Sequence, residues 1–262
     1  MTTDADRARL WRGWRPVLFA PLFALLLTGM CSVLPSQPLK RSRTAPLRST
    51  YPVGFGRPTI LVDPGHGGRQ PGAVRPHSPA EKDINLRVAR ALETHLERDG
   101  MFHVELTRND DSTLSIGARR RASRSLKPAA FVSIHANATA QATSTRRGVM
   151  VIASRRQGPR TAKRSEALAR WTARALKDQG FPLRDGVRRP RRPAAFDYIA
   201  QAPGVWITQR RTLGVLRFNP RPAVLVETHY LDNPADVRAF QNDDAIARFC
   251  RGMELALLNY LR

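Results

Sequence analysis

The stretch ILVDPGHGGRQPGAV, residues 60–74, decides how the fold can be built. Apolar or β-branched residues at positions 59–62 indicate a buried strand, which breaks at once into Asp63, a proline, a histidine and glycines. A strand that ends in glycine lets another group approach the backbone closely, or aims a side chain at a fixed point. The side chain aimed in this way is His66.

After residue 57 short apolar runs alternate with amphipathic stretches, and no internal repeat is visible. The apolar runs predict strands over 59–63, 104–107, 130–135, 148–153 and 223–228. The amphipathic stretches predict helices over 79–98, 115–127, 162–179 and 243–261. This alternation predicts an α/β fold, a three-layer sandwich with a mostly parallel, mixed central sheet covered by helices on both faces.

Titratable side chains follow several of the predicted strands. His66 follows the first strand, His135 ends a later one and Glu227 ends the last, while Glu81 begins the first helix. Sites in such folds gather at the carboxyl ends of strands, so these side chains are expected at one edge of the sheet. Two histidines and one carboxylate form a common catalytic zinc set with a fourth position open to water, which makes His66, Glu81 and His135 candidate ligands. Glu227, whose pKa desolvation would raise, is the candidate proton carrier.

Each candidate also has a structural explanation. His66 could be a turn residue beside glycines, and His135 a buried polar residue at a strand end. The segment Ser78–Glu81 reads as a capping box, in which the glutamate would bond only to the backbone of the cap. Glu227 could pair with one of the many arginines. Taken singly, these explanations compete with the metal site.

The remaining histidines carry weaker expectations. His229 lies two residues after Glu227, so it would share the same strand face and could contact a substrate if the strand continues. His95 and His103 lie in a charged helix and at a strand entry, which predicts surface positions.

Seven motifs together resemble one protein family. In chain order they are VDPGHGG, PGAV, EKDINL, LTRNDD, FVSIHAN, GVMV and PAVLVETHYLDNPAD. They are similar to the zinc-dependent N-acetylmuramoyl-L-alanine amidases, the peptidoglycan amidases of bacterial cell division, over roughly residues 58–261. The resemblance implies that His66, Glu81 and His135 bind Zn²⁺ and that Glu227 is the catalytic glutamate. The implied substrate is peptidoglycan, cut between the lactyl group of N-acetylmuramic acid and the first L-alanine of the stem peptide.

The N-terminus indicates export. Arginines precede an uncharged run over 16–34, which is typical of a signal peptide or a signal anchor. No A-x-A cleavage site follows, and Met30 before Cys31 is unfavourable for lipidation, so membrane contact through an uncleaved segment stays open. The predicted location is the periplasm or cell envelope. The predicted organisation is an export segment over 1–35, a basic linker over 36–56 and a zinc amidase catalytic domain over 57–262.

The charge limits the partners. The chain has 44 basic and 21 acidic residues, a net charge of +23. The arginines are spread along the chain without interleaved stacking aromatics, which argues against a specific nucleic-acid partner, and a genome-wide arginine bias explains this spread at least as well. An anionic envelope polymer or a membrane surface fits the same charge. With two cysteines, one of them in the export segment, no structural disulfide is expected.

The segment between Ser154 and Pro222 departs from the family pattern. Residues 155–193 hold 13 basic and 3 acidic residues, which predicts a solvated basic helix followed by a loop. Some division amidases carry an insertion that covers the zinc and is moved by a membrane-bound activator, so the resemblance leaves a lid and a protein activator open. Two other functions also stay open: a non-catalytic wall-binding or regulatory protein on this fold, and a zinc peptidase acting within the stem peptide.

Overall fold

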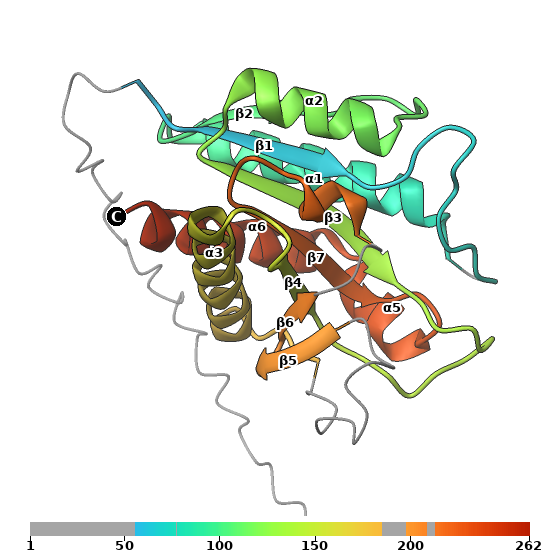
Figure 1. The fold of residues 1–262 in the computed structure, drawn as a ribbon. Coiled ribbons are helices and arrows are strands. Elements are labelled where there is room, and N and C mark those ends of the chain that lie inside the picture. Colours follow the sequence, from blue (N-terminus) through green and yellow to red (C-terminus); the bar gives the residue numbers. More distant parts are fainter. Residues whose placement is uncertain (1–55, 77, 185–197, 209–212) are drawn as a thin grey trace, which may run out of the picture. The chain divides into compact units, whose positions relative to one another are not determined.

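The computed structural model describes residues 56–76, 78–184, 198–208 and 213–262 (Figure 1). Within them the strands are β1 (Thr59–Pro64), β2 (His103–Leu106), β3 (Ala130–Asn137), β4 (Met150–Ser154), β5 (Tyr198–Ala202), β6 (Val205–Thr208) and β7 (Ala223–Tyr230). The helices are α1 (Glu81–Arg98), α2 (Ile116–Leu126), α3 (Pro159–Asp178), α4 (Gly214–Arg217), α5 (Pro234–Phe240) and α6 (Asp243–Leu261).

The strands form one sheet in the order β2-β1-β3-β7-β4-β6-β5. The pairs β2–β1, β1–β3, β3–β7 and β4–β6 are parallel, whereas β4–β7 and β5–β6 are antiparallel. The sheet is therefore mostly parallel and mixed, as the sequence predicts. The carboxyl ends of β1, β3 and β7 consequently meet at one edge.

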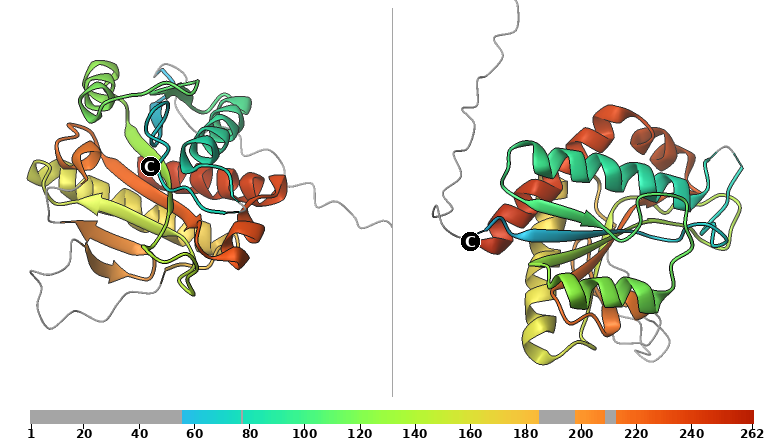
Figure 2. Two further views of the ribbon diagram at one scale, coloured as in Figure 1. Left: turned by 90° about the vertical axis from the view of Figure 1, so that its right-hand side faces the viewer. Right: turned by 90° about the horizontal axis from the view of Figure 1, so that it is seen from above.

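Helices cover both faces of the sheet. Seen from above, α1 and α6 lie on one side of β1 and α2 lies on the other (Figure 2). The larger core packs α1, α3 and α6 against inward residues such as Ile60, Val132 and Val224. The smaller core packs α2 and α4 against Leu61, Phe131 and Leu225, which point to the other face of the sheet from the same three strands. Odd-numbered residues of β1, β3 and β7 thus face α2 and α4, which follows from the two-residue period of a strand.

The predicted elements are confirmed in type, with shifts at their ends. α3 begins three residues before its predicted start because Pro159 occupies a first-turn position, where its missing N–H is not needed. β5 and β6 were not predicted, because the segment over 186–206 has no regular hydrophobic period. The expected loop after the basic helix therefore contains two strands. Residues 185–197 and 209–212 of this region lie outside the described part of the chain.

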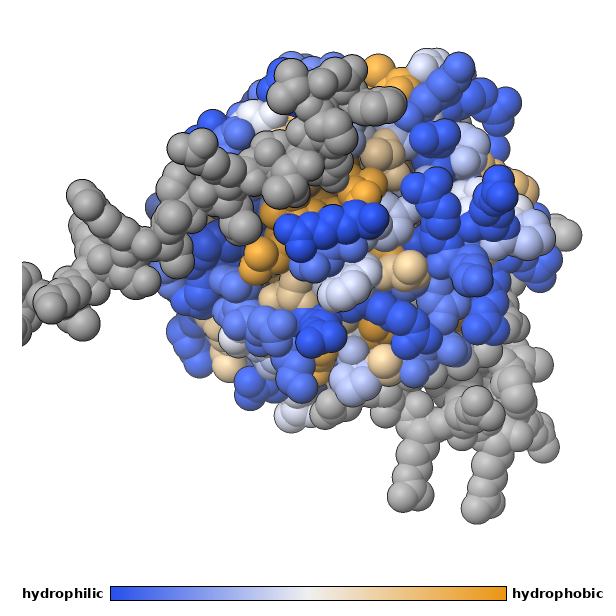
Figure 3. All heavy atoms as spheres, turned by 90° about the vertical axis from the view of Figure 1, so that its left-hand side faces the viewer, coloured by the Kyte–Doolittle hydropathy of each residue, from blue (hydrophilic) through white to orange (hydrophobic). Residues whose placement is uncertain are grey.

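The predicted export segment lies within residues 1–55, which the structure does not describe, so it stays a prediction together with the linker. Among the described residues, no helix is both long enough and apolar enough to cross a membrane. The side where β1 begins and α6 ends carries mainly hydrophilic side chains, with small apolar patches between them (Figure 3). The functional side chains described next lie at the opposite, carboxyl edge of β1.

Candidate metal centre

Three of the predicted site residues meet at this edge. His66 Nε2 lies 3.2 Å from Glu81 Oε1, and His135 Nδ1 lies 2.9 Å from the same oxygen. The two imidazole rings are nearly perpendicular, with centroids 4.9 Å apart. One ligand atom from each of the three residues lies within 4.8 Å of the others. The structure thus brings together residues 66, 81 and 135, although their binding of a metal stays a prediction.

Glycines allow the loop after β1 to place His66. A Cβ on Gly65 would lie 2.2 Å from His135 Nε2, so only glycine lets the loop pass this close to the second imidazole. His66 itself has φ 60°, in the left-handed region that few residues with a side chain adopt. Gly67 follows with φ 126°, which other residues rarely adopt. The glycine-rich stretch therefore sets the direction of a histidine side chain.

Backbone N–H groups orient the carboxylate of Glu81. Oε2 accepts a hydrogen bond from Ala73 N at 2.8 Å, and Oε1 accepts one from Ala136 N at 3.3 Å. The capping-box explanation is wrong, because α1 begins at Glu81 and the side chain of Ser78 donates to Pro79 O instead. Glu81 lies in the first turn of α1, where the helix dipole favours its negative charge.

The electrostatics keep Glu81 ionised. Burial opposes its charge, but hydrogen bonds from His135 and His66 outweigh burial and hold the pKa of Glu81 well below its usual range. The pKa of His135 is raised, because its bond to Glu81 and the nearby carboxylates Glu227 and Asp63 outweigh the effect of burial. An anionic carboxylate between two imidazoles is a donor set that favours a divalent cation.

Glu227 lies beside this group on the neighbouring strand. It pairs in register with His135, and both are odd-numbered residues on the face of the sheet toward α2 and α4. Glu227 Oε2 is buried and has no hydrogen-bond partner among the described residues, so the alternative explanation, a pair with an arginine, finds no support there. Burial raises the pKa of Glu227 to about 7, with His135 lowering it and Glu81 raising it. A carboxyl with this pKa can exchange a proton near neutral pH.

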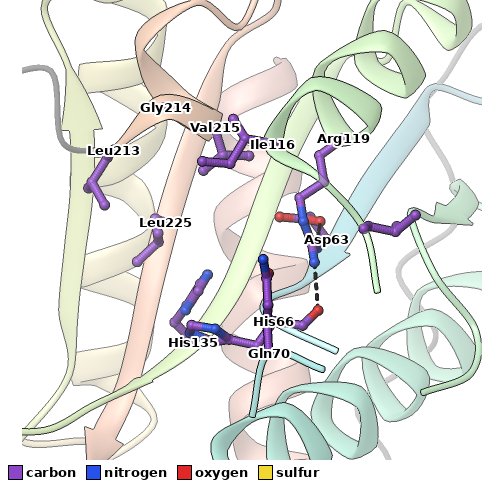
Figure 4. Close-up of a pocket in the computed structure, with 11 residues that line it drawn as sticks. Asp63, His66, Gln70, Ile116, Arg119, His135, Leu213, Gly214, Val215 and Leu225 are labelled. Carbon is purple, nitrogen blue, oxygen red and sulfur yellow. Dashed lines mark hydrogen bonds and ion pairs between the residues drawn. The ribbon is translucent and has the colours of Figure 1, made fainter. Parts of the chain in front are cut away.

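A pocket of about 200 Å³ opens next to the histidines. His66 and His135 form one end of it, and most of the remaining wall is apolar (Figure 4). The apolar wall comes from β7 and from the starts of α2 and α4 with the residues just before them; it consists of Leu114, Ile116, Leu213, Val215 and Leu225. Because Ile116 is 51% exposed, the pocket has a partly solvent-accessible wall. The arrangement combines a possible cation site, a proton carrier and room for an organic substituent.

Comparison with known proteins identifies the family. The family model for N-acetylmuramoyl-L-alanine amidases matches residues 60–259, which is most of the chain. The chain belongs to the N-acetylmuramoyl-L-alanine amidase family. It is 31% identical over 198 residues to N-acetylmuramoyl-L-alanine amidase AmiC of Neisseria meningitidis serogroup B, a match that covers 69% of this chain and 47% of AmiC. The chain therefore spans about half the length of this relative.

Solved structures of amidases share the fold. The catalytic domain of CwlV, an N-acetylmuramoyl-L-alanine amidase from Bacillus (Paenibacillus) polymyxa var. colistinus, superposes with a TM-score of 0.59 at 26% identity. That match covers 78% of this chain and 98% of the CwlV chain. The CwlD amidase from Clostridioides difficile, solved in complex with the GerS lipoprotein, gives a TM-score of 0.61 at 25% identity. It covers 78% of this chain and 98% of CwlD.

Three other histidines of this amidase-family chain, His95, His103 and His229, lie apart from the three candidate ligands, and His77 lies outside the described residues. His229 does not share the face of Glu227, because a register shift in β7 adds one residue between the pairs His135–Glu227 and Asn137–Tyr230. The ring of His229 stacks on Phe240 of the larger core, and His229 is 3% exposed. His95 is also less exposed than predicted, since its Nε2 lies 3.0 Å from Glu254 Oε2 between α1 and α6. His103 is partly exposed, near the predicted surface position.

Sequence reasoning missed the residues that surround the candidate ligands. Asp63 is 1% exposed and accepts hydrogen bonds from Thr107, Ser133 and Arg119. Arg108 and Arg119 are 4% and 5% exposed and donate to the backbone beside His66. Asp63 and Arg108 belong to the motifs VDPGHGG and LTRNDD, so the motifs were visible although their roles were not. Arg119 gave no signal, because it is one of several arginines in a basic helix.

Proposed function

We propose that this protein is a zinc-dependent hydrolase that cleaves the amide between the lactyl group of N-acetylmuramic acid and L-alanine in peptidoglycan. Family membership supports the reaction. The observation that carries the metal assignment is the convergence of His66, Glu81 and His135, which lie far apart in the sequence.

The donor set fits zinc. Zinc bound tetrahedrally at about 2.0 to 2.2 Å from nitrogen and oxygen ligands leaves neighbouring ligand atoms about 3.3 Å apart. The separations of 3.2 and 2.9 Å from Glu81 Oε1 to His66 Nε2 and His135 Nδ1 are close to this value, and no two of the three ligand atoms are more than 4.8 Å apart. His66, Glu81 and His135 would hold the ion, and the fourth position would stay open. When bound there, zinc activates water and polarises the carbonyl of an amide.

Glu227 supplies the proton transfers. As a carboxylate it takes a proton from the attacking water, and as a carboxylic acid it returns that proton to the departing alanine nitrogen. Burial raises its pKa to about 7 in the protein without metal, which favours a side chain that can both take up and release a proton. Its Oε2 is buried and has no hydrogen-bond partner among the described residues, so no bond within that part of the protein competes for this oxygen.

The test uses Glu227→Gln in the full-length protein. The amide side chain keeps the shape but cannot carry the proton, so the variant should retain bound zinc and lose at least about a hundredfold in rate. Zinc content is measured by elemental analysis and turnover by release of peptides from purified peptidoglycan. A variant that digests peptidoglycan as fast as the parent would refute the role of Glu227.

Product analysis separates this reaction from the two other functions. An amidase releases whole stem peptides with N-terminal alanine and leaves bare glycan chains, which mass spectrometry detects. Truncated stem peptides would instead indicate a peptidase. Wall binding without stoichiometric zinc or released peptides would indicate a non-catalytic binding protein.

The cellular setting is part of the same proposal. We infer that residues 1–35 direct export, that 36–56 form a linker and that 57–262 form the catalytic domain, acting in the periplasm or cell envelope during daughter-cell separation. The complex of the CwlD amidase with the GerS lipoprotein supports the idea of a protein activator at the membrane. A lid within 155–222 stays a hypothesis, because 185–197 and 209–212 lie outside the described residues.

A further inference from the structure

Two buried arginines enclose the loop that carries His66. Arg108 follows β2 and Arg119 lies in α2, and they are 4% and 5% exposed. Arg108 Nε and Arg119 Nη1 both donate to Pro64 O, at 3.0 and 2.8 Å. Buried guanidinium groups are costly to desolvate unless their N–H groups are well bonded, so their placement here needs a reason.

Arg108 connects the segments of two candidate ligands. Its Nη2 donates to Gly65 O and to Lys82 O, both at 2.9 Å. Gly65 directly precedes His66, and Lys82 directly follows Glu81. One planar guanidinium group therefore fixes the distance between the β1–α1 loop and the start of α1. A lysine has no planar fork with which to make the same pair of bonds.

Arg119 fixes the conformation of His66 itself. Its Nη2 donates to His66 O at 2.6 Å, and its Nη1 forms an ion pair with Asp63 (Figure 4). His66 has φ 60°, a strained backbone conformation for a residue with a side chain, which persists only where the surroundings impose it. The hydrogen bond from Arg119 to the carbonyl of this residue is such a constraint.

The same network reaches the strand of the third ligand. Ser133 Oγ donates to Asp63 Oδ2 at 2.7 Å, two residues before His135 on β3. Gly65 N donates to Ile134 O at 2.9 Å. The β1–α1 loop, α1 and β3 are therefore joined by bonds that involve no candidate ligand side chain.

We propose that Arg108 and Arg119 are positioning residues that hold the segments of His66, Glu81 and His135 at ligand distance, so that metal binding requires little rearrangement. This inference rests on the metal site of the proposed function. The guanidinium groups of Arg108 and Arg119 lie beside the proposed zinc site, and their positive charge by itself opposes the binding of a metal ion. The proposed role explains why two buried arginines are present there. Their hydrogen-bond geometry, and not their charge, is the part that favours the metal.

The test measures metal affinity in the full-length variants Arg108→Lys and Arg119→Lys. Both keep the charge and remove the planar fork. We expect each to weaken zinc binding by about 10- to 100-fold, the usual effect of losing a group that orients a ligand. Affinity is measured by competition with a chelating dye, and ligand geometry by the visible spectrum of the cobalt-substituted protein, which should change in both variants.

Arg221→Lys is the matched control. Arg221 Nε donates to Pro128 O at 2.7 Å, a backbone carbonyl two residues before β3, at the end of the strand opposite to His135. This variant should lose less stability, because Arg221 is only partly buried, and its zinc affinity and cobalt spectrum should match those of the parent. The free energy of unfolding in urea, measured with the metal removed, allows the three variants to be compared at known stability.

Several outcomes would overturn the inference. The inference is wrong if Arg108→Lys and Arg119→Lys bind zinc with an affinity within twofold of that of the parent. It is also wrong if Arg221→Lys loses as much zinc affinity as these two variants. If the arginine variants do not fold, Ser133→Ala removes one bond to Asp63 and should weaken zinc binding by about threefold; an unchanged affinity there also counts against the network. A parent that binds zinc but releases no peptide would contradict the proposed reaction while leaving this inference intact.

Discussion

His229 makes the stability of this protein depend on pH. Its ring is 3% exposed and stacks on Phe240 with centroids 4.7 Å apart and an interplanar angle of 13°. Nδ1 lies 2.9 Å from Thr228 Oγ1, whereas Nε2 is buried without a partner among the described residues. Burial lowers the pKa of His229 from 6.5 to about 4, and the charge of Glu81 opposes the shift.

The size of the effect follows from the difference in proton binding. Between pH 6.5 and about 4 the unfolded chain binds a proton at His229 that the folded protein does not bind, so stability falls as the pH falls. Lowering the pH from 7 to 5 should cost about 2 kcal/mol through this group alone. The loss should approach a limit of roughly 3 kcal/mol once the pH is below 4.

The variant His229→Phe isolates this contribution. Phenylalanine retains the stacking on Phe240 and has a similar volume, but it cannot bind a proton. Loss of the contact with Thr228 should lower stability at all pH values by about 1 kcal/mol. The decrease in stability from pH 7 to 5 should be about 2 kcal/mol smaller in the variant than in the parent.

Urea unfolding followed by circular dichroism, with a chelator present, measures both proteins at pH 7 and pH 5. His103→Gln is the control, because it removes a partly exposed histidine and leaves the buried ring in place. It should retain the pH dependence of the parent. Equal pH dependence in the parent and His229→Phe would show that the buried imidazole is not the group responsible.

Three further predictions concern the site. Gly65→Ala should lower zinc affinity and turnover by at least about a hundredfold, because the new Cβ would lie 2.2 Å from His135 Nε2. The control Gly158→Ala, with no atom within 4 Å of its Cβ, should change neither the zinc affinity in the dye competition assay nor the release of peptides from peptidoglycan. The kcat should fall about tenfold per pH unit once the pH drops below the pKa of Glu227, which is about 7 in the protein without metal and lower beside a cation. The profile is therefore measured down to the lowest pH at which zinc stays bound, and a flat profile over that whole range would contradict its role as a base. Ile116→Trp should narrow the pocket beside the histidines and raise KM about tenfold with little change in Tm, because this side chain is 51% exposed; an unchanged KM would place the substrate elsewhere.

The order of elements and the candidate ligands could be predicted because local rules govern them. A β-branched run that breaks into glycine, and helices with a clear apolar stripe, indicate their structure within a few residues. α6 begins and ends where its periodicity predicts, at Asp243 and Leu261. β5 and β6 could not be predicted in this way, because their pairing depends on a neighbouring strand and not on their own period.

The sequence by itself determined the family, the α/β class and the chemical types at positions 66, 81, 135 and 227, because these depend on residue identity and spacing. Only the tertiary structure decided whether Glu81 caps a helix or faces two imidazoles, since both arrangements use the same local sequence. It also decided the positions of Arg108, Arg119 and His229. A bulge in β7 and hydrogen bonds across about 50 residues of chain are long-range features, and a single sequence does not specify them.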